Sequence, residues 1–117
     1  MKPSMSLFLI KSAQKRIILI DNYIDDSVLT MLDKRVSGVS AEVYTMQISK
    51  QLAQDIAKHD SQYIPILVRT LKKAHDRFLI IDDDVYHVGA SLKDLGKKWT
   101  AIMKMENIDL TLLLSHL

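Results

Sequence analysis

A histidine and an arginine two positions apart, His75 and Arg77, carry the most chemical information in this chain. On an extended backbone, successive side chains point to opposite faces, so these two should project together. The planar guanidinium of arginine can donate two parallel hydrogen bonds to phosphate oxygens. Histidine can act as a nucleophile or proton carrier near neutral pH. The pair therefore predicts an anion site that suits a phosphate. Taken alone, His75 could equally be an ordinary histidine at the edge of a strand.

The elements that must position this pair alternate between helix and strand in the first half of the chain. Apolar spacing predicts a helix within residues 4–15, and the continuous apolar run at 16–20 is typical of a strand covered on both faces. A second helix should start at Asp25 or Asp26, run to Val36 and end at Gly38. Residues 41–48 alternate like a strand, and Ser49 can then cap a third helix.

The second half of the chain is richer in strand patterns. Strands are expected at 66–68 after Pro65, at 77–81, at 85–88 and at 99–105, with Asp82-Asp83-Asp84 as a turn. Residues 108–117 fit either a helix or a strand. The hairpin beside an alternating first half predicts an α/β fold with a mixed, largely parallel β-sheet flanked by helices.

Length and composition restrict the possible classes. With 117 residues, 48% of them apolar and 26% charged, the chain predicts one globular domain spanning 1–117, either a whole protein or a fragment of a longer one. Cysteine is absent, so disulfides and thiolate metal sites are excluded and a cytoplasmic location is the default. Apolar runs reach only four or five residues, which predicts no transmembrane helix and no membrane partner.

The net charge of +2 does not by itself indicate a nucleic-acid-binding protein. The lysines, however, gather in sequence around His75 and Arg77. The candidate nucleic-acid contacts are Lys72, Lys73, Lys93, Lys97 and Lys98. Trp99 follows them and could stack on a base or pack in the core.

The segment from His75 to Ser91 resembles the phospholipase D superfamily. That family carries His-x-Lys, four residues, Asp, and six more residues before Gly-Ser; here His75, Arg77, Asp82 and Gly89 keep this spacing. Three positions depart from the family pattern. Arg77 stands for the lysine, Ala90 stands for the serine, with Ser91 one position later, and Leu92 stands where the family has asparagine.

The resemblance implies a phospholipase-D-like fold and a phosphodiesterase, nuclease-like, that needs no metal and no cofactor. One histidine would form a phosphohistidine while a second protonates the leaving oxygen. Because the chain has one such motif, the resemblance implies a homodimer acting on nucleic acid, DNA in particular. The candidate catalytic residues are His75, Arg77, Asp82, Ser91 and Glu106. Glu106 would orient the histidine, and Asp82 would accept backbone hydrogen bonds in the turn.

Several alternatives stay open. Asp82-Asp83-Asp84 could suggest a cation site, although consecutive side chains diverge on an extended backbone and a solvated turn is the simpler interpretation. His87 could line the cleft or fill a face, while His59 and His116 look like surface residues. The competing functions are a degenerate nucleic-acid-binding or assembly module, favoured by the three departures, and a lipid-directed enzyme.

Overall fold

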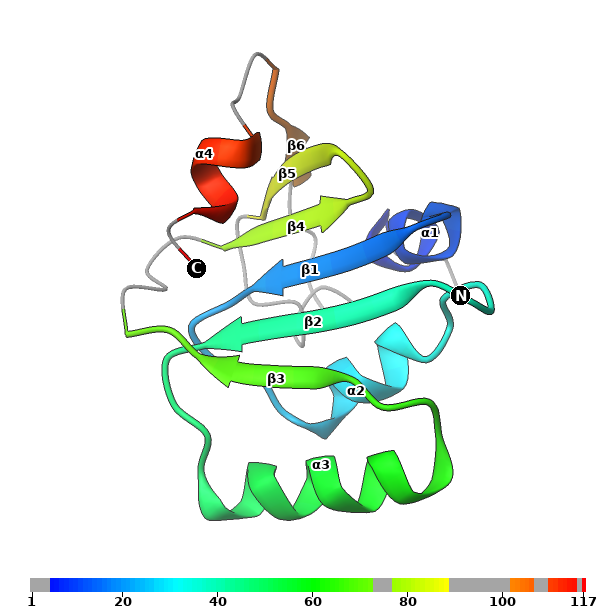
Figure 1. Ribbon diagram of the computed structural model, residues 1–117, viewed down its shortest axis with the longest axis vertical. Coiled ribbons are helices and arrows are strands. Elements are labelled where there is room, and N and C mark those ends of the chain that lie inside the picture. Colours follow the sequence, from blue (N-terminus) through cyan, green and yellow to red (C-terminus); the bar gives the residue numbers. More distant parts are fainter. Residues whose placement is uncertain (1–4, 73–76, 89–101, 107–109, 116) are drawn as a thin grey trace.

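A mixed β-sheet organises the computed structural model, which describes residues 5–72, 77–88, 102–106, 110–115 and 117 (Figure 1). Within these residues the sheet has six strands in the order β3-β2-β1-β4-β5-β6. The strands are β1 (Arg16–Ile20), β2 (Ser40–Thr45), β3 (Leu67–Thr70), β4 (Phe78–Ile81), β5 (Asp84–Val88) and β6 (Ile102–Lys104). The helices are α1 (Met5–Ser12), α2 (Asp26–Leu32), α3 (Lys50–Gln62) and α4 (Leu110–Leu114).

Strand β1 is the junction between two halves of the sheet. It pairs in parallel with β2, which pairs in parallel with β3. On its other side β1 pairs antiparallel with β4, and β4, β5 and β6 continue antiparallel. The expected α/β class with a mixed sheet is confirmed. The expectation of a largely parallel sheet needs correction, because the antiparallel hairpin contributes as much of the sheet as the parallel unit.

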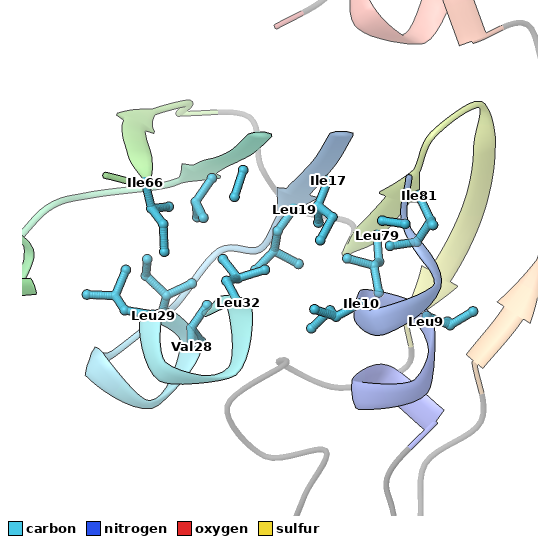
Figure 2. Packing of buried hydrophobic residues seen from close by; sticks show 14 of the residues in the cluster. Leu9, Ile10, Ile17, Leu19, Val28, Leu29, Leu32, Ile66, Leu79 and Ile81 are labelled. Atoms are coloured by element: carbon cyan, nitrogen blue, oxygen red, sulfur yellow. The ribbon is translucent and has the colours of Figure 1, made fainter. Parts of the chain in front are cut away.

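The main core lies between the sheet and helices α1, α2 and α3. Alternation sends Ile17 and Leu19 of β1 to this face, where they meet α2 through Leu29 and Leu32 (Figure 2). Ile10 of α1 is fully buried in the same cluster. Each large aliphatic side chain buried in this way stabilises the fold by roughly 1.5–3 kcal/mol relative to exposure.

A smaller core covers the opposite face of the sheet. Ile18, Ile20, Ile80 and Val85 point there. Three leucines of α4 pack against them together with Leu117, namely Leu110, Leu113 and Leu114. This packing decides the ambiguous segment at the C-terminus: residues 110–114 are helical because leucines at helical spacing can cover the apolar sheet face. Among the residues described, no helix combines the length and apolarity that crossing a membrane requires.

The helix boundaries follow their caps. Asp25 caps α2, accepting a hydrogen bond from the Ser27 N–H, and Ser49 caps α3, accepting one from the Leu52 N–H. The prediction that the second helix reaches Val36 is wrong. It ends at Leu32, because Arg35 binds the carbonyl oxygens of Leu32 and Val39 and turns the chain into β2. Strands β2 and β3 also end at Thr45 and Thr70 instead of the expected positions 48 and 68.

Candidate functional site

Four chain segments meet at one end of the sheet. The parallel strands β1, β2 and β3 all finish there, and the antiparallel β4 begins there (Figure 1). The residues at these strand ends are Asp21 after β1, Thr45 at the end of β2, Leu71-Lys72 after β3 and Arg77 before β4. Loops that follow the carboxyl ends of parallel strands are the usual place for ligand groups in open α/β sheets.

An ion pair at this end joins Asp21 and Arg77. Because Ile20 pairs with Phe78, the next residues out, Asp21 and Arg77, lie side by side. The Arg77 Nε is 3.5 Å from the Asp21 Oδ1. The Asp21 side chain is 1% exposed, whereas the Arg77 side chain is 30% exposed. The carboxylate is thus held inside the protein, and the guanidinium extends from it towards solvent.

Asp21 is also part of the loop that follows β1. Its Oδ1 accepts a hydrogen bond from the Tyr23 N–H at 3.2 Å, and its own N–H donates to the Tyr44 carbonyl at 3.0 Å. These bonds fix the carboxylate relative to both β1 and β2. The Arg77 carbonyl in turn accepts from the Val88 N–H, which ties the arginine to β5.

Further polar atoms lie buried at the same end of the sheet. By strand alternation Asp21, Thr45 and Arg77 all belong to the face covered by helices α1 to α3. The Thr45 Oγ1, Asn22 Oδ1 and Arg77 Nε are buried and form no hydrogen bond within the described part of the chain. The Arg77 Nε faces the Asp21 carboxylate, whereas the Thr45 Oγ1 and the Asn22 Oδ1 have no such partner among the residues that the structure describes. Buried polar groups are normally paired, so these two atoms at one end of the sheet are consistent with a place where a ligand or water binds.

Most of the candidate residues from the sequence fall outside the described residues. This holds for His75 and Ser91, and for the lysines Lys73, Lys93, Lys97 and Lys98. Lys72 is described: it is exposed and follows β3, so it belongs to the same end of the sheet as Arg77. Trp99 and His116 also lie outside the described ranges.

Asp82 lies at the opposite end of the hairpin from Arg77. Its carboxylate accepts hydrogen bonds from the N–H groups of Gln14, Lys15 and Arg16, at 2.6 to 3.2 Å. Burial raises the pKa of Asp82, but these three donors outweigh it, and the pKa is held below its usual value. The sequence predicted backbone hydrogen bonds for this residue; the donors come from the segment before β1.

Two other candidates are separated from Arg77. Ile102 pairs with Val88 near Arg77, and β6 then runs away from that end, so Glu106 continues towards the end that carries Asp84. The described geometry therefore does not bring Glu106 and Arg77 together. His87 is exposed and pairs with Phe78, its ring 5.6 Å from the Phe78 ring. This places His87 on the sheet face opposite Arg77, as the face-filling alternative requires.

The three consecutive acids of the turn have three different partners. Asp82 binds main-chain N–H groups, Asp83 pairs with Arg16 at 3.0 Å, and Asp84 pairs with Lys104 at 3.5 Å. Across the residues that the structure describes, no group of three or more His, Asp or Glu side chains converges as a metal site would require. The diverging partners support the interpretation as a turn.

His59 corrects an expectation from the sequence, because it is buried instead of lying on the surface. It is 8% exposed. Its Nε2 contacts the Asp33 carboxylate at 2.7 Å, and its Nδ1 contacts the Asp60 Oδ1 at 2.8 Å. Burial lowers the pKa of His59, but the hydrogen bonds to Asp60 and Asp33 outweigh it and raise the pKa above its usual value.

The His59 cluster and a surface groove near it lie away from Arg77. A groove of about 650 Å³ runs along the start of β2 and the residues before β3, and it includes Arg35 and Asp60. The Arg35 guanidinium already donates to the carbonyl oxygens of Leu32, Val39 and Ile64. That arginine therefore serves the fold, and the groove has the character of an apolar surface hollow.

Sequence reasoning did not single out Asp21 as a candidate site residue. A signal was present: an acidic residue stood directly after a strand buried on both faces, at a carboxyl end. What the sequence could not supply was the neighbour across the sheet, because the pairing of β1 with β4 brings together residues far apart in the chain.

Comparisons with known proteins bear on the fold. No model of a known protein family matches the chain, and no curated protein does. Among solved structures, the chain is similar to TrmBL2, an archaeal chromatin protein described as showing a novel mode of DNA binding, with a TM-score of 0.54 and 19% identity. The match covers 94% of this chain and 44% of that one, so the chain spans less than half the length of TrmBL2.

A second similar structure is NucT from Helicobacter pylori, with a TM-score of 0.60 and 17% identity. This match covers 94% of this chain and 79% of NucT. At such identities the likeness concerns the arrangement of helices and strands alone. This arrangement agrees with the α/β fold and mixed sheet expected from the sequence.

Proposed function

We propose that this chain is a phospholipase-D-like domain that binds the phosphodiester backbone of nucleic acid at the sheet end carrying Arg77 and cleaves it without a metal. The observation that carries the proposal is the buried Asp21 beside a partly exposed Arg77, 3.5 Å apart. A guanidinium fixed in this way presents N–H donors in the geometry that phosphate oxygens accept.

The surrounding charge supports an extended anionic ligand. Lys72 is exposed at the same end of the sheet. In sequence, Lys73 adjoins it, and Lys93, Lys97 and Lys98 complete the proposed contacts to the nucleic-acid backbone. Similarity in fold to TrmBL2, a chromatin protein that binds DNA, favours DNA as the form to test first.

The proposed reaction follows the family resemblance. His75 attacks phosphorus, the bond to the leaving oxygen breaks, and that oxygen takes a proton from a second histidine. Water then hydrolyses the phosphohistidine and restores His75. Arg77 would stabilise the negative charge on the non-bridging oxygens, and Ser91 would add a hydrogen bond. Since the chain carries one such motif, the second histidine would be His75 of another copy in a homodimer.

A binding or assembly module without turnover is the second candidate. It is favoured by Arg77, Ala90 and Leu92, which replace the lysine, serine and asparagine of the family pattern. The anion site would be the same in both cases. The two candidates differ in whether His75 performs chemistry.

Cleavage in EDTA separates the candidates. Single- and double-stranded DNA are incubated with the wild type, with His75→Ala and with His87→Ala. His87 is a matched control because it belongs to the same hairpin and lies on the opposite face of the sheet. Cleavage that survives EDTA and His87→Ala but is lost in His75→Ala supports the enzyme. Binding with no cleavage by the wild type supports the module.

Salt dependence tests the binding itself. We expect affinity for DNA to fall as salt rises, and Arg77→Gln should reduce the slope of log affinity against log salt by about one. Arg69→Gln is the matched control, because Arg69 is exposed on β3 and shares the opposite face with Tyr44. Equal effects of both substitutions would argue for non-specific surface charge and against a site at Arg77. Light scattering would test the homodimer.

A further inference from the structure

We propose that Asp21 is a positioning residue that aims the Arg77 guanidinium at the phosphate and makes arginine, instead of lysine, the required residue at this position. The inference rests on the proposed function and deepens it. It concerns an acidic residue that the family motif from His75 to Ser91 does not contain, and that lies on a different strand of the sheet.

Asp21 is a fixed point in the structure. Its side chain is 1% exposed, and its Oδ1 accepts the Tyr23 N–H at 3.2 Å. Its main-chain N–H bonds to Tyr44 of the neighbouring strand. Because both main chain and carboxylate are held, the negative charge has a defined place at the end of β1.

Arg77 faces this charge through one particular nitrogen. The Nε is the guanidinium atom within 3.5 Å of the Asp21 Oδ1, and it is buried. The contact is an ion pair without hydrogen-bond geometry. A guanidinium is planar and rigid, so holding its Nε near the carboxylate limits the directions in which the two terminal NH₂ groups can point. The side chain is 30% exposed, which leaves part of it accessible to an anion.

Lysine could not do both tasks at once. Its ammonium is a single point charge on a flexible stem, and next to a buried carboxylate it would turn towards that carboxylate. Arginine can face Asp21 with Nε and offer its terminal NH₂ groups to a phosphate. Arginine would therefore stand where the phospholipase D superfamily has lysine because this chain pairs Arg77 with an acid at the end of β1.

A purely structural role for Asp21 predicts something different. If the carboxylate only closed the loop through Tyr23, its replacement would weaken the protein in the same sense whatever residue stands at 77. A positioning role predicts that the sign of the effect depends on residue 77. This dependence is the readout that distinguishes the two roles.

The test is a double-mutant cycle on affinity for a short single-stranded DNA, measured by fluorescence anisotropy at low salt. The variants are Asp21→Asn, Arg77→Lys, both together, and Arg77→Gln. We expect Asp21→Asn alone to weaken binding about tenfold, within the roughly 100-fold that a misplacement of about 1 Å can cost. In the Arg77→Lys background the same substitution should instead strengthen binding, because it releases the ammonium from the carboxylate.

Folding is controlled in parallel. Each variant is compared by thermal melting, and binding is measured well below the lowest melting temperature. Asp21→Ser is a second variant for the case that the amide is not accommodated, because its hydroxyl can still accept the Tyr23 N–H without carrying charge. It should show the same reversal of sign between the two backgrounds.

The outcomes are distinguishable. Weaker binding with arginine at 77 and stronger binding with lysine there supports the inference. If the wild type binds DNA and Arg77→Gln abolishes binding, yet Asp21→Asn weakens binding equally in both backgrounds or in neither, the inference is overturned and the proposed function stands. If the wild type binds no DNA, the proposed function fails and the inference fails with it.

Discussion

The Asp82 carboxylate accepts a hydrogen bond of 2.6 Å from the main-chain N–H of Lys15. It receives the N–H groups of Gln14 and Arg16 as well, and in return the Asp82 N–H donates to the Arg16 carbonyl. The Asp82 side chain in the hairpin turn thus holds in place the residues that lead into β1.

Replacing Asp82 should weaken the fold measurably. Asp82 has φ +55°, a left-handed conformation that asparagine tolerates, so Asp82→Asn removes charge without adding much backbone strain. We expect a loss of about 1 kcal/mol in the free energy of unfolding in urea, since the acceptor is charged but near solvent. Asp83→Asn is the control: its exposed pair with Arg16 should change stability by less than about 0.5 kcal/mol. An equal loss in both variants would contradict the special role of Asp82.

The Asp82 carboxylate should also make the free energy of unfolding depend on pH in the acid range. Burial raises the pKa of Asp82, but the three N–H donors lower it by more. The pKa of Asp82 in the folded protein therefore lies below the unfolded value. Its stabilisation is then fully present above the unfolded pKa, about 3.9, and is lost as the pH falls through the folded pKa. The difference in unfolding free energy between wild type and Asp82→Asn should therefore be constant near neutrality and shrink below about pH 4. A difference that grows in acid would contradict it.

His59 predicts the opposite trend with pH. Burial lowers its pKa, but Asp60 and Asp33 outweigh this and raise it above the unfolded value. The contribution of His59 to stability is thus fully present below the unfolded pKa, about 6.5, and is lost as the pH rises through the folded pKa. We expect the stability advantage of the wild type over His59→Gln to be larger at pH 5.5 than at pH 8.5, measured by urea unfolding. Tyr63, whose ring lies 5.3 Å from that of His59, provides a fluorescence probe of the same region.

Replacing Gly38 should destabilise the fold through backbone conformation alone. Its φ is +90°, and a Cβ added there would meet nothing within 4 Å. Gly38→Ala should therefore lower the unfolding free energy by about 1 kcal/mol through backbone strain alone, without any steric clash. Gly38→Asn should lose less, because asparagine tolerates positive φ better than alanine does. An alanine variant as stable as the wild type would show that the turn can relax.

Sequence patterns predicted the features that depend on interactions between residues close together in the chain. The apolar run at 16–20, the Ser49 cap and the turn at Asp82 could all be predicted, because each depends on a few adjacent residues. Features set by distant neighbours could not. The environment of His59 depends on Asp33, which directly follows α2. The pairing of Asp21 with Arg77 depends on the register of β1 against β4.

The position of Glu106 relative to Arg77 also could not be predicted from the sequence. Its position after an apolar strand made it a reasonable orienting acid, yet the direction of a strand within the sheet decides which end its last residue reaches. Strand β6 starts beside Val88, so its continuation leads away from Arg77. Spacing within the sequence carries no information about that direction.

The central position of β1 has a consequence for biosynthesis. Strands β1 and β2 come well before β4 in the chain, so a ribosome makes this parallel pair while one flank of β1 still lacks the partner that Ile17 later finds in Ile81. An unpaired flank of apolar residues invites pairing with other nascent chains. The hairpin that brings Arg77 into place therefore also covers the flank of β1 that other chains could pair with.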